Sequence, residues 1–203
     1  FIGGIGSLVY FVILPIFFPK EAPISPDNQA PIETPEPLSH QSFLISPPAS
    51  ETAITLPSID YLTIVTELQS EALSQLADGQ IKEVKLSTQE GQVPFFGFFS
   101  EITPAASGLD ESWFEKDFTS LIYYDARGVW PIYVAKISPS ADPGLLKTWL
   151  RELETAWEIE NFYLLPPDPF AAFKDGVYRD YATRYSVGSD PGASFNYGVF
   201  GSY

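Results

Sequence analysis

The chain has no cysteine and only one histidine, His40, among its 203 residues. Without cysteine, disulfide bonds and thiolate metal sites are excluded. Basic residues are also scarce, since 11 Lys and Arg stand against 26 Asp and Glu, which gives a formal net charge of −15. This charge argues against nucleic acid as a partner, because phosphates require basic patches, and against docking on anionic lipid head groups.

The usual sequence signals of catalysis are missing as well. His40 lies in a proline-rich stretch where no fold is expected to hold it, so neither a Ser-His-Asp triad nor a histidine metal site can be assembled. The patterns G-x-S-x-G, Ser-x-x-Lys, Walker A and G-x-G-x-x-G do not occur. The sequence therefore predicts no catalytic residue, no cofactor and no metal ligand.

What the chain does have is a long uncharged stretch, FIGGIGSLVYFVILPIFF, from Phe1 to Phe18. As a helix its 18 residues measure roughly 27 Å, close to the hydrocarbon core of a bilayer. We predict a transmembrane helix at 1–18 that inserts in the lipid bilayer, with a cleaved signal peptide or a buried helix as alternatives. Gly3 and Ser7 have the small-xxx-small spacing that would let two such helices self-associate, although the frequency of glycine in membrane helices is the ordinary and favoured explanation.

Residues 19–57 carry nine of the chain's 19 prolines. This density favours a polyproline-like extended linker over a helix or sheet. The only apolar cluster in it is Phe43–Ile45, which is expected to pack on the domain or on a partner. A long acidic portion after the anchor fits the outer side of a membrane, so the expected location is the cell membrane, single-pass, with the C-terminal domain outside the cytoplasm.

Hydrophobic periodicity predicts the elements of the folded part, 58–203. Apolar residues at helical spacing predict a helix from Tyr61 to the turn signal Asp78-Gly79. The strongest helical pattern covers 143–158, with Asp142 as N-cap. The other predicted elements are a strand at 81–87, a short helix (or a strand) at 94–102, a short helix from the capping box Ser112-x-x-Glu115 to Phe118, a hairpin of 119–125 with 129–137, and a second hairpin of 179–187 with 193–203.

This order of elements predicts an α+β fold, a mainly antiparallel sheet with helices packed on one face. It differs from the strict alternation of strand and helix in parallel α/β enzymes. The expected organisation is a transmembrane helix at 1–18, a proline-rich linker at 19–57 and an α+β globular domain at 58–203.

Four segments carry a resemblance to known proteins: LIYYDARGVWPIYVAKI (121–137), GLLKTWLRELETAW (144–157), FKDGVYRDYATRYSV (173–187) and SFNYGVFGSY (194–203). Together with the apolar stretch and the proline-rich linker, they resemble uncharacterised single-pass envelope proteins of candidate-phyla (patescibacterial) bacteria. The resemblance implies the same architecture and location. It also implies that the domain is truncated, because in that family the last segment runs on into a further apolar strand and a helix.

Tyrosines near the C-terminus are the candidates for a binding surface, because such rings stack on sugars or peptides. The candidate residues are Tyr178, Tyr181, Tyr185 and Tyr197. The structural alternative is that these rings pack within strands while their hydroxyls stay hydrated.

Two groups of acidic residues are candidates for cation binding or acid–base work. The first lies at the end of the predicted helix 143–158: Glu152, Glu154, Glu158 and Glu160. The second lies near a proline-rich breaker at 164–170: Asp168, Asp175 and Asp180. A solvated helix face and Asp-rich turns are the ordinary explanations of such groups.

The sequence favours a non-enzymatic, membrane-anchored extracytoplasmic protein that binds or positions another envelope or surface protein. One alternative is a subunit of a pilin-like filament, since mature pilins also begin with Phe and an apolar helix. Ile5 stands where pilins usually carry Glu, which weakens that reading. The other alternative is a carboxylate-based enzyme such as a glycosidase, which requires two carboxylates facing each other across a cleft.

Overall fold

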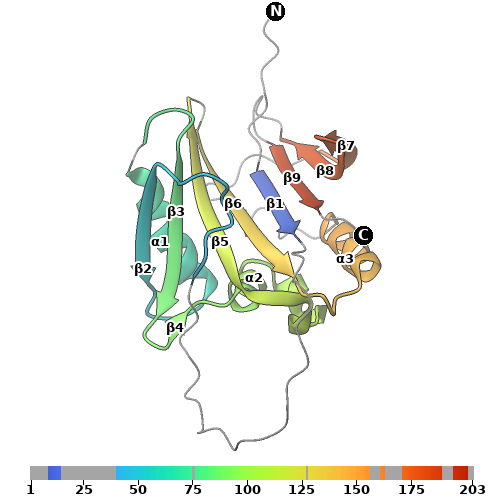
Figure 1. Cartoon of the computed structure of the whole chain (residues 1–203), viewed down its shortest axis with the longest axis horizontal. Helices are drawn as coiled ribbons and strands as arrows, with labels where there is room; N and C mark the ends of the chain where they lie inside the picture. Colours follow the sequence, from blue (N-terminus) through green and yellow to red (C-terminus); the bar gives the residue numbers. More distant parts are fainter. Residues whose placement is uncertain are drawn as a thin grey trace, which may run out of the picture.

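The computed structural model describes residues 9–14, 40–74, 76–126, 128–155, 161–162, 171–188 and 194–200. Its strands are β1 (Val9–Leu14), β2 (Ser50–Thr55), β3 (Ile81–Thr88), β4 (Gly91–Gln92), β5 (Phe114–Asp125), β6 (Gly128–Ile137), β7 (Lys174–Tyr178), β8 (Tyr181–Val187) and β9 (Ser194–Val199). They form one nine-stranded sheet with the order β2-β3-β5-β6-β1-β9-β8-β7, and β4 pairs with β3 beside this path (Figure 1). Five pairings are antiparallel and three are parallel, which confirms an α+β fold with a mainly antiparallel sheet.

β1 lies in the middle of the sheet and runs parallel to both neighbours. Val12, for example, pairs with Val134 of β6 on one side and with Gly198 of β9 on the other. The predicted helix over 1–18 is therefore wrong for Val9–Leu14. Two reasons apply: Val, Tyr, Phe and Ile favour strands, and β6 and β9 both offer backbone groups that an inserted strand satisfies.

The remaining residues of the predicted anchor, with Gly3 and Ser7, lie outside the described residues. Within the ranges that the structure describes, no helix is long and apolar enough to cross a membrane.

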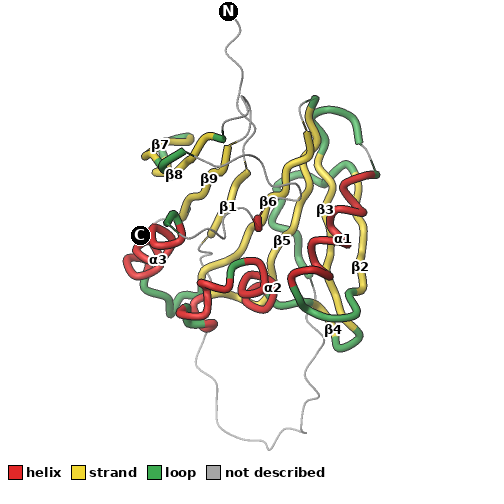
Figure 2. Tube along the Cα trace, turned by 180° about the vertical axis from the view of Figure 1, so that it is seen from behind, coloured by secondary structure: helices red, strands yellow, loops and turns green. Residues whose placement is uncertain are grey.

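Three α-helices in the described part of the chain cover one face of the sheet: α1 (Tyr61–Leu73), α2 (Phe95–Ile102) and α3 (Pro143–Leu153) (Figure 2). Asp60 caps α1 by accepting a hydrogen bond from the backbone N–H of Thr63, and Asp142 caps α3 in the same way through Gly144 and Leu145. The predicted helix starts at 61 and 143 are thus confirmed. The buried side chains of all three helices join one hydrophobic core with the sheet.

Aromatic rings from α2 fill the centre of this core. The Phe98 ring centroid lies 4.8 Å from that of Phe118 on β5 and 4.9 Å from that of Tyr133 on β6. The Phe162 ring centroid lies 6.4 Å from that of Tyr133 on β6 and 5.6 Å from that of Phe195 on β9. The Phe162 ring therefore contacts both strands that flank β1. Ring pairs at these separations contribute about 0.5–1.5 kcal/mol each beyond their buried area.

Most of the other predicted elements are confirmed: the strand at 81–87, the short helix at 94–102 and both hairpins, to which the structure adds β7. The helix predicted from Ser112-x-x-Glu115 is wrong. Glu111–Trp113 form a single 3₁₀ turn capped by Asp110, and β5 begins directly at Phe114. Phe114 and Phe118 pair with β6 and enter the core, so long-range pairing overrides the local capping pattern.

The folded part begins earlier than the predicted boundary at 57/58. Ser50–Thr55 form β2, which runs parallel to β3 along all six residues. Before it, residues 40–49 cross the face of the sheet opposite the helices. Phe43 and Leu44 pack there on Leu121, Ile132 and Val134, while Ile45 is fully exposed, so the apolar cluster at 43–45 contacts the domain itself.

A proline in β1 tests its place in the sheet. Both edges of β1 are paired, so Val12→Pro removes a backbone N–H that serves β6 or β9 and should lower the free energy of unfolding by about 1–3 kcal/mol, because a carbonyl of the neighbouring strand loses its donor. Val12→Ala keeps the N–H and is the matched control. Urea denaturation of both variants measures the difference, and equal stability of the two would show that β1 does not hold the sheet together.

Candidate functional site

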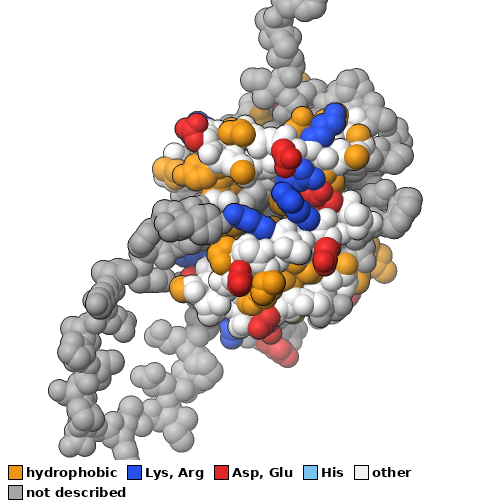
Figure 3. Space-filling view, turned by 90° about the vertical axis from the view of Figure 1, so that its right-hand side faces the viewer, with side chains coloured by type: hydrophobic (Ala, Val, Ile, Leu, Met, Phe, Trp, Pro, Cys, Tyr) orange, Lys and Arg blue, Asp and Glu red, His pale blue; other side chains and the backbone are white. Residues whose placement is uncertain are grey.

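A groove with a volume of about 420 Å³ separates α3 from strands β7–β9. Its α3 side includes Lys147, Thr148 and Arg151, and its strand side includes Asp175, Thr183, Arg184 and Tyr197. Figure 3 views the molecule from this side, and Lys and Arg side chains lie in the middle of the view with Asp and Glu side chains among them. Three of the chain's 11 basic residues, Lys147, Arg151 and Arg184, therefore line this one groove.

Arg184 of β8 lies at the centre of the groove and connects the strands to α3. Its Nε and Nη2 groups donate to the two carboxylate oxygens of Glu154, the C-cap residue of α3, at 2.7 and 2.6 Å. Its Nη1 group donates to Oδ1 of Asp175 on β7 at 2.8 Å. The bidentate contact to Glu154 is the strong, directional form of an arginine–carboxylate pair, so it fixes the guanidinium in place.

Glu154 also accepts a hydrogen bond from the hydroxyl of Tyr197. Burial opposes its ionisation, but the bonds from Arg184 and Tyr197 outweigh this effect and lower the pKa of Glu154. Burial, and then the bond to Glu154, raises the pKa of Tyr197. Glu154 is therefore a charged structural partner at neutral pH rather than a proton donor.

Lys147 and Arg151 bring two further positive charges to the groove. Both side chains are exposed, and residues four apart in a helix lie on the same face, one turn from each other. Asp175 is the opposing charge at the rim, where its side chain is 84% exposed. The groove therefore carries the side chains of Lys147 and Arg151 exposed to solvent, beside the Arg184 guanidinium that Glu154 and Asp175 neutralise.

The candidate tyrosines do not share one face of the sheet. Tyr178 pairs with Tyr181 across the β7–β8 hairpin, and Tyr185 lies four residues further along β8 on the same face, where its ring covers Gly176. Tyr197 pairs with Arg184, whose side chain points to the opposite face. Only Tyr197 therefore lines the groove, whereas Tyr178 and Tyr181 are 41% and 47% exposed on the other face.

Of the two acidic groups, the structure brings together one member of each. Glu154 and Asp175 meet at Arg184, while Glu158, Glu160 and Asp168 lie outside the described residues. No group of three or more His, Asp or Glu side chains in the described ranges is placed to hold a metal ion.

Sequence reasoning missed Arg184, although one signal was available: it is the only charged residue in β8.

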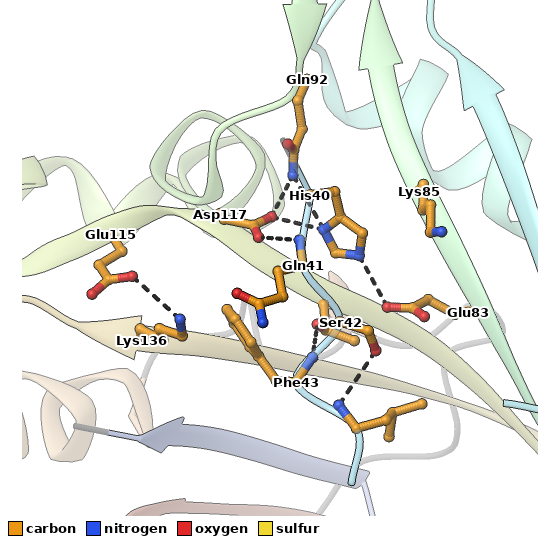
Figure 4. A network of polar contacts seen from close by, with 12 residues as sticks. His40, Gln41, Ser42, Phe43, Glu83, Lys85, Gln92, Glu115, Asp117 and Lys136 are labelled. Atoms are coloured by element: carbon orange, nitrogen blue, oxygen red, sulfur yellow. Dashed lines mark hydrogen bonds and ion pairs between the residues drawn. The ribbon is translucent and has the colours of Figure 1, made fainter. Parts of the chain in front are cut away.

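A second polar cluster fastens the start of residues 40–49 to the sheet (Figure 4). The two ring nitrogens of His40 face two carboxylates, with Nδ1 2.8 Å from Oδ1 of Asp117 on β5 and Nε2 3.0 Å from Oε1 of Glu83 on β3. The backbone N–H of Gln41 donates to Oδ2 of Asp117 at 2.8 Å, and Gln92 of β4 donates to Oδ1. We call this group (His40, Glu83, Gln92 and Asp117) the His40 clasp. The expectation that no fold holds His40 is wrong.

The contacts continue along the same segment. The backbone N–H of Phe43 donates to the hydroxyl of Thr119 at 3.0 Å, and the ammonium of Lys136 lies 4.5 Å above the Phe43 ring. Lys136 in turn lies 3.6 Å from the carboxylate of Glu115. The segment is therefore held by both polar and cation–π contacts.

The clasp is an electrostatic contact in a nearly buried place. Glu83 is completely buried, and its Oε2 atom has no hydrogen-bond partner among the described residues. The hydrogen bond to Asp117, together with that to Glu83, outweighs burial and raises the pKa of His40. Burial opposes ionisation of Asp117, but its bonds from His40, Gln41 and Gln92 outweigh that and lower its pKa. Lys85, next along the exposed side of β3, pairs with Glu51 instead.

These shifts fix the pH range in which the clasp stabilises the fold. Because the pKa of His40 is raised, the contribution of His40 to the free energy of unfolding is complete below the ordinary histidine pKa of 6.5. This contribution is lost as the pH rises through the raised pKa. Because the pKa of Asp117 is lowered, the contribution of Asp117 to the free energy of unfolding is complete above the ordinary aspartate pKa of 3.8. This contribution is lost as the pH falls through the lowered pKa. The clasp is strongest between these two limits.

Replacing His40 should therefore destabilise the protein in a pH-dependent way. At pH 6, His40→Ala leaves the buried Glu83 without its partner and should lower the free energy of unfolding by about 3 kcal/mol. The difference from the wild type should shrink as the pH rises through the raised pKa of His40. Urea denaturation across this range measures it, and a difference that does not change with pH would contradict the charged form of His40. The double variant His40→Ala with Glu83→Gln should recover part of the loss, because it also removes the buried carboxylate that His40→Ala leaves without its partner.

Comparison with known proteins gives no relative from which to transfer a function. The chain matches no protein family, and no curated protein or solved structure is significantly similar to it. The groove and the His40 clasp are thus the features from which function is argued.

Proposed function

We propose that this chain is a non-enzymatic binding protein of the cell envelope, and that it holds a partner protein in the groove between α3 and β7–β9. The observation that carries the proposal is the groove's positive charge. Lys147, Arg151 and Arg184 line one concave surface of a strongly acidic chain. Local charge of the sign opposite to the rest of the surface favours and orients the approach of an anionic partner.

The state of the groove's carboxylates supports binding rather than catalysis. A glycosidase needs one carboxyl group with a raised pKa and a second one facing it across the substrate. Glu154 has a lowered pKa, and both Glu154 and Asp175 contact the same guanidinium of Arg184. This pair holds the walls of the groove together and is not arranged around a substrate.

The His40 clasp gives this binding protein a fixed attachment to its proline-rich segment. Because residues 40–49 lie against the sheet, a force on the preceding residues is passed directly to β3 and β5 through His40. As a polyproline-like chain, residues 19–39 would extend at most roughly 65 Å. The domain would therefore hold its partner within that distance of whatever the N-terminal residues contact.

The proposed location is the cell membrane, with residues 1–18 in the bilayer and the domain outside the cytoplasm. The support is the length and apolarity of this stretch. Val9–Leu14 cannot pair with β6 and β9 and span a bilayer at the same time. Anchoring thus requires that β1 leave the sheet, and the protein would have a released and an inserted form.

Site-specific cross-linking tests the binding site. A photo-reactive amino acid in place of Thr148, on the α3 side of the groove, should give an adduct of one defined mass with a partner protein in the cells that carry this chain. The same amino acid in place of Lys116, an exposed residue of β5 outside the groove lining, is the control. Adducts that are equal at the two positions, or absent at both, would contradict the proposal.

The absence of cysteine makes the location testable by disulfide trapping. Val12 and Val134 are register partners, and neighbouring strands lie within the Cα separation that a disulfide bridges. In the variant Val12→Cys with Val134→Cys, mild oxidation should cross-link protein purified in water. The same oxidation should form no cross-link in protein from the membrane fraction, because residue 12 of the anchored protein would lie in the bilayer, away from residue 134. Complete cross-linking in both fractions would refute the anchor, and Val12→Cys with Leu121→Cys controls for random encounters.

A further inference from the structure

The exposed cations of the groove have a spacing that matches an extended peptide. Lys147 and Arg151 lie one helical turn apart, a rise of roughly 6 Å along α3. In an extended chain, side chains on the same side recur at every second residue, about 6.7 Å apart. Two acidic residues separated by one residue therefore present their carboxylates at the spacing of these two cations.

The length of the groove sets the length of the ligand. Its α3 side runs from Gly144 to Arg151, which is roughly 10 Å of helix. An extended peptide covers that distance with three to four residues. Thr148, on the α3 side between Lys147 and Arg151, adds a hydroxyl group that can accept a hydrogen bond from a peptide backbone.

The acidic surface of the rest of the chain favours a ligand with a short anionic segment over a long polyanion such as a nucleic acid. The whole chain carries 26 acidic and only 11 basic residues, so a nucleic acid that extended beyond the groove would meet a repelling surface. A peptide that concentrates its negative charge in three or four residues avoids this repulsion. The observations thus favour a protein segment as the ligand.

Asp175 occupies the Nη1 group of Arg184, which a carboxylate of a bound peptide could otherwise contact. Its carboxylate accepts one hydrogen bond from Arg184 at 2.8 Å, yet its side chain is 84% exposed. An exposed pair of this kind contributes little to stability, so an incoming carboxylate can take its place on the guanidinium. Glu154 remains bound to the other side of Arg184 and keeps it oriented.

From these observations we propose that the groove binds an extended peptide with acidic residues at alternate positions, Asp/Glu-x-Asp/Glu. Carboxylates of the peptide contact Lys147 and Arg151, and the displacement of Asp175 lets a further carboxylate reach Arg184. This proposal rests on the proposed binding function and names the chemistry of the partner.

The test compares two fluorescent peptides of identical composition by fluorescence anisotropy with the full chain at low salt. One alternates three Glu with Val, and the other carries the three Glu in a block. The alternating peptide should bind roughly tenfold more tightly. Lys147→Glu and Arg151→Glu should each weaken it roughly five- to tenfold, since each reverses one exposed charge. Asp175→Asn should strengthen it about threefold, because it removes the competing carboxylate.

The matched control is Lys116→Glu, which makes the same charge change outside the groove and should leave binding unchanged. Equal weakening by Lys116→Glu would show an effect of net charge alone, and equal binding of the two peptides would refute the alternate spacing; either result overturns the proposal. A single cross-linked partner at position 148 could still be found in that case. The binding function would then stand, and only the acidic peptide would be excluded.

Discussion

Backbone pairing by β1 is the interaction that joins the two halves of the domain. On one side it pairs with β6 and through it with β5, β3 and β2; on the other it pairs with β9 and through it with β8 and β7. Phe162 places its ring against both Tyr133 of β6 and Phe195 of β9, the two strands that flank β1. The groove is built from the β9 half and from α3, so its position relative to the rest of the domain depends on this central strand.

The groove and the His40 clasp are both made by contacts between elements far apart in the sequence. Arg184 and Glu154 are 30 residues apart, and their bidentate bond fixes the distance between α3 and β8. His40 and Asp117 are 77 residues apart, and their contact attaches the segment before β2 to β5. In each case one ion pair both stabilises the fold and shapes the surface. The groove keeps its form because Arg184 is held from α3, and the proline-rich segment has a defined end because His40 is held from the sheet.

Secondary structure was largely predictable because it depends on local signals. Asp60 and Asp142 cap helices at the expected residues, and the hairpins follow the alternation of apolar and polar residues. Ser112-x-x-Glu115 failed because the pairing of Phe114 and Phe118 with β6 competes with the capping pattern. Val9–Leu14 failed for a related reason: an uncharged β-branched segment suits a bilayer helix or a central strand equally, and only the neighbouring strand edges decide between them.

The amino-acid sequence by itself determined the composition limits, the α+β class and the positions of most elements, since these follow from charge, periodicity and capping. It also marked Glu154, Asp175 and Tyr197 as residues of interest, but for other roles. Only the tertiary structure decided that these three meet at Arg184, that Tyr197 faces away from the other tyrosines, and that His40 is held between two carboxylates. Strand register and helix docking create these contacts over long sequence separations, where no local pattern of residues specifies them.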